Sequence, residues 1–201
     1  YFMPIGLSDA SEDKYMLGRL ENWVNGDPEF AGTQLMLSVH PNATKPVDYA
    51  SPTTLFINFP KAIDFPGGKV TDREITADHM ELMASGIYHA DVVVNYQGTT
   101  SIDASAFDKP IVNIAFDGAK NQPYLKSVRR FYQFTHYQPI IASGGVSLAR
   151  SSQELRQEIL EYLKYPEHNR AGRARIIREQ AFKYDGQASE RTAHAILAVL
   201  Q

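Results

Sequence analysis

The sequence predicts an α/β fold: a single Rossmann-like domain built on a doubly wound parallel sheet. Strand-like and helix-like segments alternate along the 201 residues, which is typical of parallel strands joined by right-handed helical crossovers. The run DVVVN (91–95) is short and continuously apolar, as in a parallel strand that helices cover on both faces. The chain is 43% hydrophobic and 21% charged, so we expect residues 1–201 to form one globular domain.

Four strands and two helices are expected in the first half of the chain. The strands are YFMPI (1–5), TQLMLSV (33–39), TLFINF (54–59) and DVVVN (91–95). The segment SEDKYMLGRLENWV (11–24) places apolar residues at helical spacing behind a candidate N-cap, Asp9 or Ser11. A second helix is expected over DHMELMASGIYHA (78–90).

The second half of the chain is expected to continue the alternation. A short helix near Thr100 to Phe107 precedes the strand PIVNIAF (110–116), where Pro110 suits the first strand position. The segment 118–140 has weak periodicity and clustered aromatic residues, so we expect a partly helical loop that carries functional contacts. The remaining expected elements are a short strand in VSLAR, a helix capped by Ser151 or Ser152 that ends near Tyr165, a basic amphipathic helix over 167–184, and a last helix after Gly186.

Composition argues against several classes of function. The net charge of −3 gives no electrostatic basis for nucleic-acid binding. The absence of cysteine excludes disulfides and thiolate–metal sites, and the histidine spacing suits no metal, so we expect no bound metal. No apolar run approaches the roughly 20 residues of a membrane-spanning helix. Because the chain starts at Tyr1 rather than Met, we expect a fragment or processed product of a larger protein.

The loop that begins at Gln97 is the most informative stretch. It follows the strand 91–95, and ligands of parallel sheets bind beyond the carboxyl ends of the strands. Backbone N–H groups at the start of the next helix favour phosphate, and Gly98 lets the backbone approach closely. Asp103 lies four residues after Thr99, on the same helical face, where its carboxylate could accept ribose hydroxyls. Equally, Thr99 could be a plain N-cap, with Asp103 complementing the helix dipole.

His40 ends the expected strand 33–39, and Pro41 favours an extended conformation for it. The imidazole is therefore expected at the same edge of the sheet as the loop after strand 91–95. There it could contact a phosphate or a nucleobase, or act in acid–base chemistry. The alternative is a histidine that merely terminates a strand.

Arg129 and Arg130 stand among aromatic residues in the segment 118–140. Arginine suits planar phosphate contacts, and aromatic side chains suit stacking on a base or sugar. The alternative is a solvated basic turn whose aromatic residues pack inward; the aromatic residues concerned are Tyr132, His136 and Tyr137. Four further arginines at helical spacing are expected to form a solvated or docking face: Arg170, Arg173, Arg175 and Arg178.

The stretches LMLSVHPN and, about fifty residues later, HADVVVNYQGTTSIDASAFDKPIVNIAFDG resemble the C-terminal half of a GT-B-type glycosyltransferase. The resemblance is to the bacterial group that contains CDP-glycerol glycerophosphotransferases, capsule-type Kdo transferases and polysialyltransferases. Those proteins carry an HP motif after one strand and a hydroxyl-rich motif before an acidic residue and KP. SSQELRQEILEYL and DGQASERTAHAIL also resemble the end of such a domain, so the resemblance covers about residues 30 to 201.

The resemblance implies a role for each matching position. His40 would be the catalytic residue, contacting the nucleotide phosphate and stabilising the charge that grows on it. The residues expected to bind the donor are Gln97, Gly98, Thr99, Thr100, Asp103, Arg129 and Arg130. Gln97-Gly98 stands where many relatives have Ser-Ser, which removes one hydroxyl donor. Asp103 stands where Glu is commoner and reaches further.

The implied function is to bind a nucleotide-activated donor, either a nucleoside diphosphate sugar or a CDP- or CMP-linked group, for glycosyl or glycerophosphate transfer. No other tightly bound cofactor is expected. The GT-B architecture also needs an acceptor-binding N-terminal half, for which 201 residues leave no room. We therefore expect the domain to act with such a half or with a partner subunit, in the cytoplasm, with peripheral attachment of the parent protein to the membrane left open.

Two alternatives remain at this point. One is a nucleotide-sugar 2-epimerase of the same overall architecture, which would place acidic catalytic residues in a cleft with the missing half. The other is a non-catalytic GT-B-like subunit that binds a partner through the basic segment 167–181 and the last helix.

Overall fold

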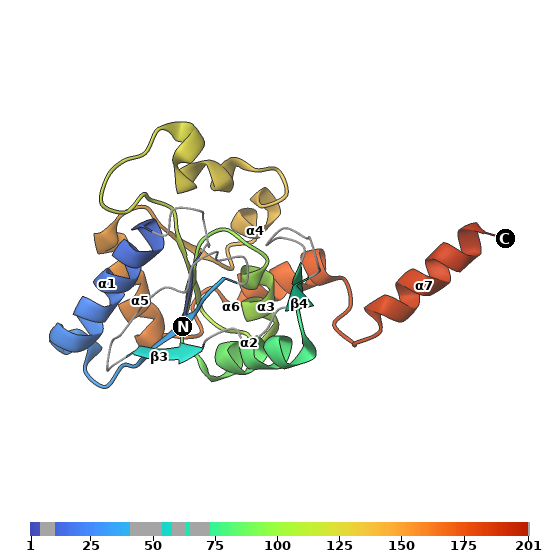
Figure 1. The fold of residues 1–201 in the computed structure, drawn as a ribbon, viewed down its shortest axis with the longest axis horizontal. Helices are drawn as coiled ribbons and strands as arrows, with labels where there is room; N and C mark the ends of the chain where they lie inside the picture. The colour runs from blue at the N-terminus through green and yellow to red at the C-terminus, as the bar shows by residue number, and fades with distance from the viewer. Residues whose placement is uncertain (5–10, 41–53, 58–62, 65–72, 201) are drawn as a thin grey trace.

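The computed structural model describes residues 1–4, 11–40, 54–57, 63–64 and 73–200 (Figure 1). Its main sheet is entirely parallel, with the order β3-β2-β1-β6-β7-β8. The strands are β1 Phe2–Met3, β2 Leu35–Ser38, β3 Thr54–Ile57, β6 Val93–Asn95, β7 Ile111–Ile114 and β8 Ser147–Ala149. Five of them follow the order 2-1-3-4-5 (β2-β1-β6-β7-β8), and β3 extends the sheet beside β2. The predicted Rossmann-like α/β fold is confirmed.

Helices alternate with these strands, as the sequence predicts. The α-helices are α1 Ser11–Gly26, α2 Ala77–His89, α3 Thr100–Ala106, α4 Gln138–Ala142, α5 Ser152–Lys164, α6 Arg170–Ile176 and α7 Ala188–Val199. Shorter helical turns are η1 Pro28–Phe30, η2 Tyr124–Lys126, η3 Val128–Gln133 and the π-helical η4 Ile177–Ala181. A separate antiparallel pair, β4 Ile63–Asp64 and β5 Arg73–Glu74, was not expected.

The sheet is buried on both faces, which explains the continuously apolar strands. In β6, Val94 belongs to the core cluster that contains the α1 residue Leu17 and the α5 residue Leu155. Its neighbour Val93 belongs to the opposite cluster, with Ile87 of α2. Figure 1 shows the same arrangement, with α1 and α5 on one side of the sheet and α2, α3 and α6 on the other. Successive side chains in a strand point to opposite faces, so both of these valines lose contact with water.

Helix α5 begins as the sequence predicts. Ser151 has extended backbone geometry, and its hydroxyl accepts the N–H of Glu154 at 3.1 Å. The Glu154 carboxylate in turn accepts the N–H of Arg150 at 2.8 Å. These contacts satisfy donors that a helix start would otherwise leave free, so the assignment of Ser151 as a cap is confirmed.

The basic helix expected over 167–184 is shorter than predicted, and its expected solvated face is wrong for Arg173. Three of its arginines are exposed, as expected: Arg170, Arg175 and Arg178. The segment contains α6 and then the π-turn η4, and Arg173 is fully buried. The Arg173 guanidinium donates to the Asp108 carboxylate at 2.9 Å and to the carbonyls of His168 and Pro166 at 2.6 and 2.9 Å. Because these three hydrogen bonds all lie inside the domain, Arg173 holds α6 in place and is not part of a docking face.

A close approach of two backbones explains how Arg173 becomes buried. A Cβ atom on Gly172 would lie 2.3 Å from the carbonyl carbon of Gly144 and from the nitrogen of Gly145. Only glycine permits such a crossing between α6 and the loop that leads to β8. The pattern of charges in the sequence could not show this contact, because it depends on a residue pair almost thirty positions apart.

The predicted last helix is present as α7, and it extends away from the rest of the domain (Figure 1). Its apolar residues are exposed, including Ile196, Leu197 and Val199. Within the described ranges, no helix is both long and apolar enough to span a membrane.

Candidate functional site

The order of the strands reverses between β1 and β6, which lie side by side in the sheet. The helix that follows β1 packs in one core cluster, and the helix that follows β6 packs in the other. In open α/β sheets, ligands bind at the carboxyl ends of the two strands beside such a reversal. The loop 97–99 follows the carboxyl end of β6, as predicted, and the strand order places it at this switch point.

The N-terminal turn of α3 leaves several donors unused. Thr99 takes the N-cap position but has helical backbone angles and makes no capping bond with its side chain. Its carbonyl accepts the N–H groups of Ile102 and Asp103 at 2.8 and 3.1 Å. In the described part of the chain, no hydrogen bond uses the N–H or the hydroxyl of Thr99 or Thr100. The side chain of Thr99 therefore does not act as a helix N-cap. Four donors of this turn, the two N–H groups and the two hydroxyls, remain available.

Asp103 supplies an acceptor beside these donors. It lies one helical turn beyond Thr99 on α3 and is partly buried. Burial raises the pKa of the Asp103 carboxyl above its ordinary value. Among the described residues, its carboxylate has neither an ion-pair partner nor a hydrogen-bond donor. A partly desolvated carboxylate of this kind is suited to accept hydrogen bonds from the hydroxyl groups of a ligand.

His40 lies at the same edge of the sheet. Phe2 of β1 pairs with Leu37 of β2 and with Val94 of β6. His40 and Gln97 are therefore each three residues beyond the same row, with one strand between them, which corresponds to a separation on the order of 10 Å. Burial lowers the pKa of His40, so the imidazole is neutral at neutral pH. Pro41, which was expected to favour an extended conformation for His40, lies outside the described residues.

Residues 118–137, which we call the cap, follow β7 and contain the helical turns η2 and η3 at the top of Figure 1. Val128 of the cap belongs to one core cluster and Tyr132 to the other, so the cap spans both layers. The Tyr132 hydroxyl donates to the carbonyl of Ile114 at 2.7 Å, at the end of β7. The segment predicted to be a partly helical loop is therefore packed onto the edge that carries the predicted site.

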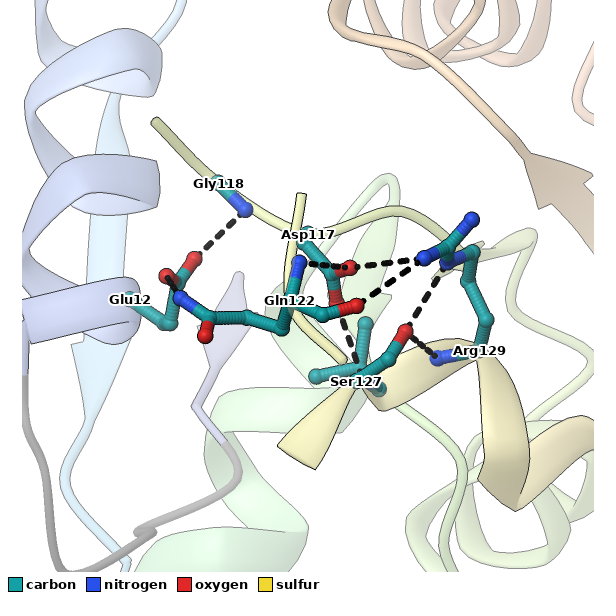
Figure 2. A network of polar contacts seen from close by, with 7 residues as sticks. Glu12, Asp117, Gly118, Gln122, Ser127 and Arg129 are labelled. Atoms are coloured by element: carbon teal, nitrogen blue, oxygen red, sulfur yellow. Dashed lines mark hydrogen bonds and ion pairs between the residues drawn. The ribbon is translucent and has the colours of Figure 1, made fainter. Parts of the chain in front are cut away.

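A buried carboxylate holds the start of the cap. Asp117 accepts the backbone N–H groups of Gln122 and Val128, both at 3.0 Å, and lies 3.3 Å from the guanidinium of Arg129 (Figure 2). On the other side, the Glu12 carboxylate of α1 accepts the N–H of Gly118 at 2.5 Å. These contacts fasten the cap to the end of β7 and to the first turn of α1.

The two candidate arginines of the cap differ in their surroundings. Besides its contact with Asp117, Arg129 donates to the Ser127 hydroxyl at 2.9 Å and to the Gln122 carbonyl at 3.3 Å (Figure 2). Its guanidinium thus stabilises the cap, although half of the side chain stays exposed. Arg130 lies with its guanidinium carbon 4.7 Å from the ring centre of Phe131. A role for either arginine in binding a donor remains a prediction.

The aromatic residues of the cap are divided between the core and the surface. Tyr132 and Tyr137 are buried, as the alternative of inward packing predicts, and their rings meet edge to face with centroids 5.9 Å apart. His136 is exposed, and its Nε2 atom lies 3.3 Å from the side-chain nitrogen of Gln97. This contact brings the cap against the loop that follows β6.

A buried polar cluster beneath the loop was not predicted. Asn95 and Asn113 occupy paired positions of β6 and β7, and the Asn113 amide donates to the Asn95 oxygen at 2.5 Å. Both asparagine amides also reach the Ser101 hydroxyl, at 3.2 and 3.3 Å. The Tyr137 hydroxyl donates to the Asn113 oxygen at 2.6 Å. The available signal was an asparagine at a matching place in two apolar strands, VVN and IVNI.

Two hollows of the described surface lie away from this edge. One is formed by α7 and the turn at Phe182, and another lies at the amino edge of the sheet, near Gln34 and Asp91. The loops 5–10 and 41–53 follow β1 and β2 at the carboxyl edge and fall outside the described residues. We therefore locate the candidate site by the strand order and the unused polar groups, and not by a cavity.

Comparisons with protein-family models, with curated proteins and with solved structures found no match to this chain.

Proposed function

We propose that this domain binds the phosphate-bearing part of a nucleotide-activated donor at the carboxyl edge of its sheet. The proposed donor is a nucleoside diphosphate sugar or a CDP- or CMP-linked group, as in the donor-binding half of a GT-B-type transferase. The observation that carries the proposal is a set of groups at the switch point that have no partner among the described residues: the N–H and hydroxyl groups of Thr99 and Thr100, with the Asp103 carboxylate one turn away.

The chemistry of these groups is divided in the way a nucleotide requires. Backbone N–H groups and hydroxyls donate hydrogen bonds, so the two threonines suit phosphate oxygens. A carboxylate only accepts, so Asp103 suits the hydroxyls of a ribose or sugar and would repel a phosphate placed beside it. A ligand that carries a phosphate next to a polyhydroxyl group satisfies both ends of the arrangement.

His40 would act from the other side of β1. A neutral imidazole carries one ring N–H, which can donate a hydrogen bond to a phosphate oxygen. If that oxygen belongs to the leaving nucleotide, the bond strengthens as charge develops in the transition state, and the rate of transfer rises. In this proposal His40 is the catalytic residue of the chain, and the acceptor and its base come from another part of the parent protein or from a partner in the cytoplasm.

One observation favours the non-catalytic alternative as a second candidate. Helix α7 exposes Ile196, Leu197 and Val199, and an apolar hollow lies between this helix and Phe182. A helix of this length is marginal in water unless an apolar face is covered. A domain that serves mainly to bind a partner subunit would account for this face without any donor site.

Calorimetric titration of the domain with UDP, CDP, GDP and CMP tests the proposal. We expect at least one of them to bind with a dissociation constant below about 1 mM. Asp103→Ala should then weaken that nucleotide by about 1 to 3 kcal/mol, the scale of a hydrogen bond to a charged group. Glu190→Ala, which removes an exposed acid from the first turn of α7, is the matched control and should bind like the wild type. No binding of any of the four nucleotides would contradict the proposal.

A further inference from the structure

We infer that Tyr137 is a positioning residue that fixes the loop 97–99 and the first turn of α3 relative to the cap, through its bonds to Ser101 and Asn113. The consequence for ligand affinity rests on the donor site proposed above. The consequence for the loop itself does not, because it follows from contacts within the domain.

The Tyr137 hydroxyl stands at the meeting point of three segments. It donates to the Asn113 oxygen of β7 at 2.6 Å and lies 2.9 Å from the Ser101 hydroxyl of α3. Tyr137 is itself the last residue of the cap and precedes α4. One hydroxyl therefore joins the cap, the sheet and the helix that begins at the candidate site.

These three groups are buried and have fixed partners. Tyr137 is 1% exposed, and Ser101 and Asn113 are fully buried. The Ser101 hydroxyl also receives the amides of Asn95 and Asn113, and its carbonyl accepts the Ser105 hydroxyl at 2.7 Å. A buried network with satisfied partners has one low-energy arrangement, because each broken bond leaves a polar group without water.

The Tyr137 hydroxyl is linked to the loop through Ser101, which lies in the first turn of α3. Burial raises the pKa of Tyr137 to about 12, against which Ser101, the backbone N–H of Gly98 and Asn113 act by stabilising the ionised oxygen. The backbone N–H of Ser101 donates to the Gly98 carbonyl at 3.2 Å, so the position of Ser101 also fixes the end of the loop. The N–H groups of Thr99 and Thr100 come next in the chain and remain unpaired in the described structure. By holding Ser101, the Tyr137 hydroxyl therefore fixes the turn that carries these unpaired donors.

Tyr137→Phe tests this inference, with Tyr162→Phe as the matched control. Tyr162 is equally buried, and its hydroxyl also has two partners, Ser147 at 3.0 Å and Asn169 at 2.7 Å, but these lie beside α5 and α6. Each variant removes one buried hydroxyl and keeps the ring. A merely structural role predicts the same behaviour for both variants, whereas a positioning role predicts a local difference.

Hydrogen exchange followed by NMR gives the readout that needs no ligand. The amide of Ser101 donates to the Gly98 carbonyl, and that of Ile102 to the Thr99 carbonyl. We expect Tyr137→Phe to speed exchange of these two amides roughly three- to tenfold relative to the amides of α5, the effect of losing one hydrogen bond. Tyr162→Phe should leave them unchanged. Equal acceleration of all amides in Tyr137→Phe would overturn the inference.

Nucleotide titration is the second readout. With a nucleotide that binds the wild type, Tyr137→Phe should raise the dissociation constant roughly three- to tenfold and Tyr162→Phe should not change it. If the wild type binds no nucleotide while exchange changes as expected, the proposed function fails and the positioning role stands. Unchanged affinity in Tyr137→Phe would remove Tyr137 from the site.

Ser101→Ala covers the case in which Tyr137→Phe does not fold. It deletes the other hydroxyl of the pair and should speed exchange of the Ile102 amide in the same way. When both single variants fold, the double variant should be no faster than the faster single one, because residues that share one contact are not additive. Additive effects would show that the two hydroxyls act independently and would overturn the inference.

Discussion

Asp117 and Arg129 form an ion pair of 3.3 Å in which the carboxylate is buried and half of the guanidinium side chain is exposed. The same carboxylate receives two backbone N–H groups of the cap. Arg129 was predicted from its sequence context to bind phosphate. In the structure its first role is to neutralise the acid that holds the cap on the end of β7.

The first prediction concerns this carboxylate. Asp117→Asn should destabilise the domain by about 1 to 3 kcal/mol, because an amide offers one oxygen where the carboxylate offers two to charged and backbone donors. Urea unfolding followed by circular dichroism measures the change. Asp185→Asn is the control, since that exposed acid pairs with Arg191 on the surface, and it should cause little change. If both variants lose the same stability, Asp117 does not hold the cap.

The second prediction concerns the hydroxyl of Thr99. Because that hydroxyl makes no capping bond, Thr99→Val should leave the melting temperature almost unchanged while it weakens nucleotide binding about three- to tenfold. Thr76→Val gives the opposite pattern, since the Thr76 oxygen accepts the N–H of His79 at the start of α2. It should lose up to about 1 kcal/mol of stability and keep its affinity. A clear loss of stability in Thr99→Val would show that the Thr99 side chain does serve as the N-cap of α3.

The third prediction uses the pKa of Asp103, which burial raises. A raised pKa in the folded state means that ionisation costs stability as the pH rises from the ordinary value of 3.8 through the folded value. Asp103→Asn, which cannot ionise, should therefore be more stable than the wild type at neutral pH. The pH-dependent part of this difference should vanish below the ordinary pKa.

Thermal melts of both proteins across the acidic range measure the Asp103 difference. The same variant should bind nucleotide more weakly, because an amide accepts hydroxyl donors less strongly than a carboxylate. Higher stability together with lower affinity is the pattern of a residue kept for binding. Lower stability of Asp103→Asn at neutral pH would mean that the carboxylate has a stabilising partner in the fold.

The fourth prediction tests how α6 is held. Gly172→Ala should destabilise the domain by about 3 kcal/mol or more, because its Cβ would meet backbone atoms that cannot move aside. Gly18→Ala is the contrasting variant in α1, where no atom lies within 4 Å of the added Cβ. It should stabilise the domain by about 0.5 to 1 kcal/mol, since alanine favours a helix. Chemical denaturation of the two variants gives opposite signs if the crossing is as described.

The elements that could be predicted from sequence are those that local patterns determine. The runs that became β6 and β7, the helices α2 and α5, and the Ser151 cap all depend on residues close together in the chain. The position of the loop 97–99 at the carboxyl edge of the sheet also followed, because the strands of a parallel sheet all end at the same edge.

The features that could not be predicted depend on contacts between distant segments. Arg173 is buried because a glycine in α6 meets the loop before β8. Asn113 joins β6, α3 and the cap, and no single stretch of sequence contains its partners. Arg129 lies twelve residues after Asp117, and only the fold of the cap shows that they pair.

The most direct test of the proposed donor site is an NMR titration of the labelled domain with the tightest-binding of the four nucleotides. The account predicts that the amide resonances of Thr99 and Thr100, whose N–H groups are unpaired in the described structure, shift most strongly and saturate at the affinity found by calorimetry. Resonances of α7 should stay unchanged. If the shifts gather at the amino edge of the sheet or along α7 while Thr99 and Thr100 do not move, the carboxyl-edge donor site is contradicted.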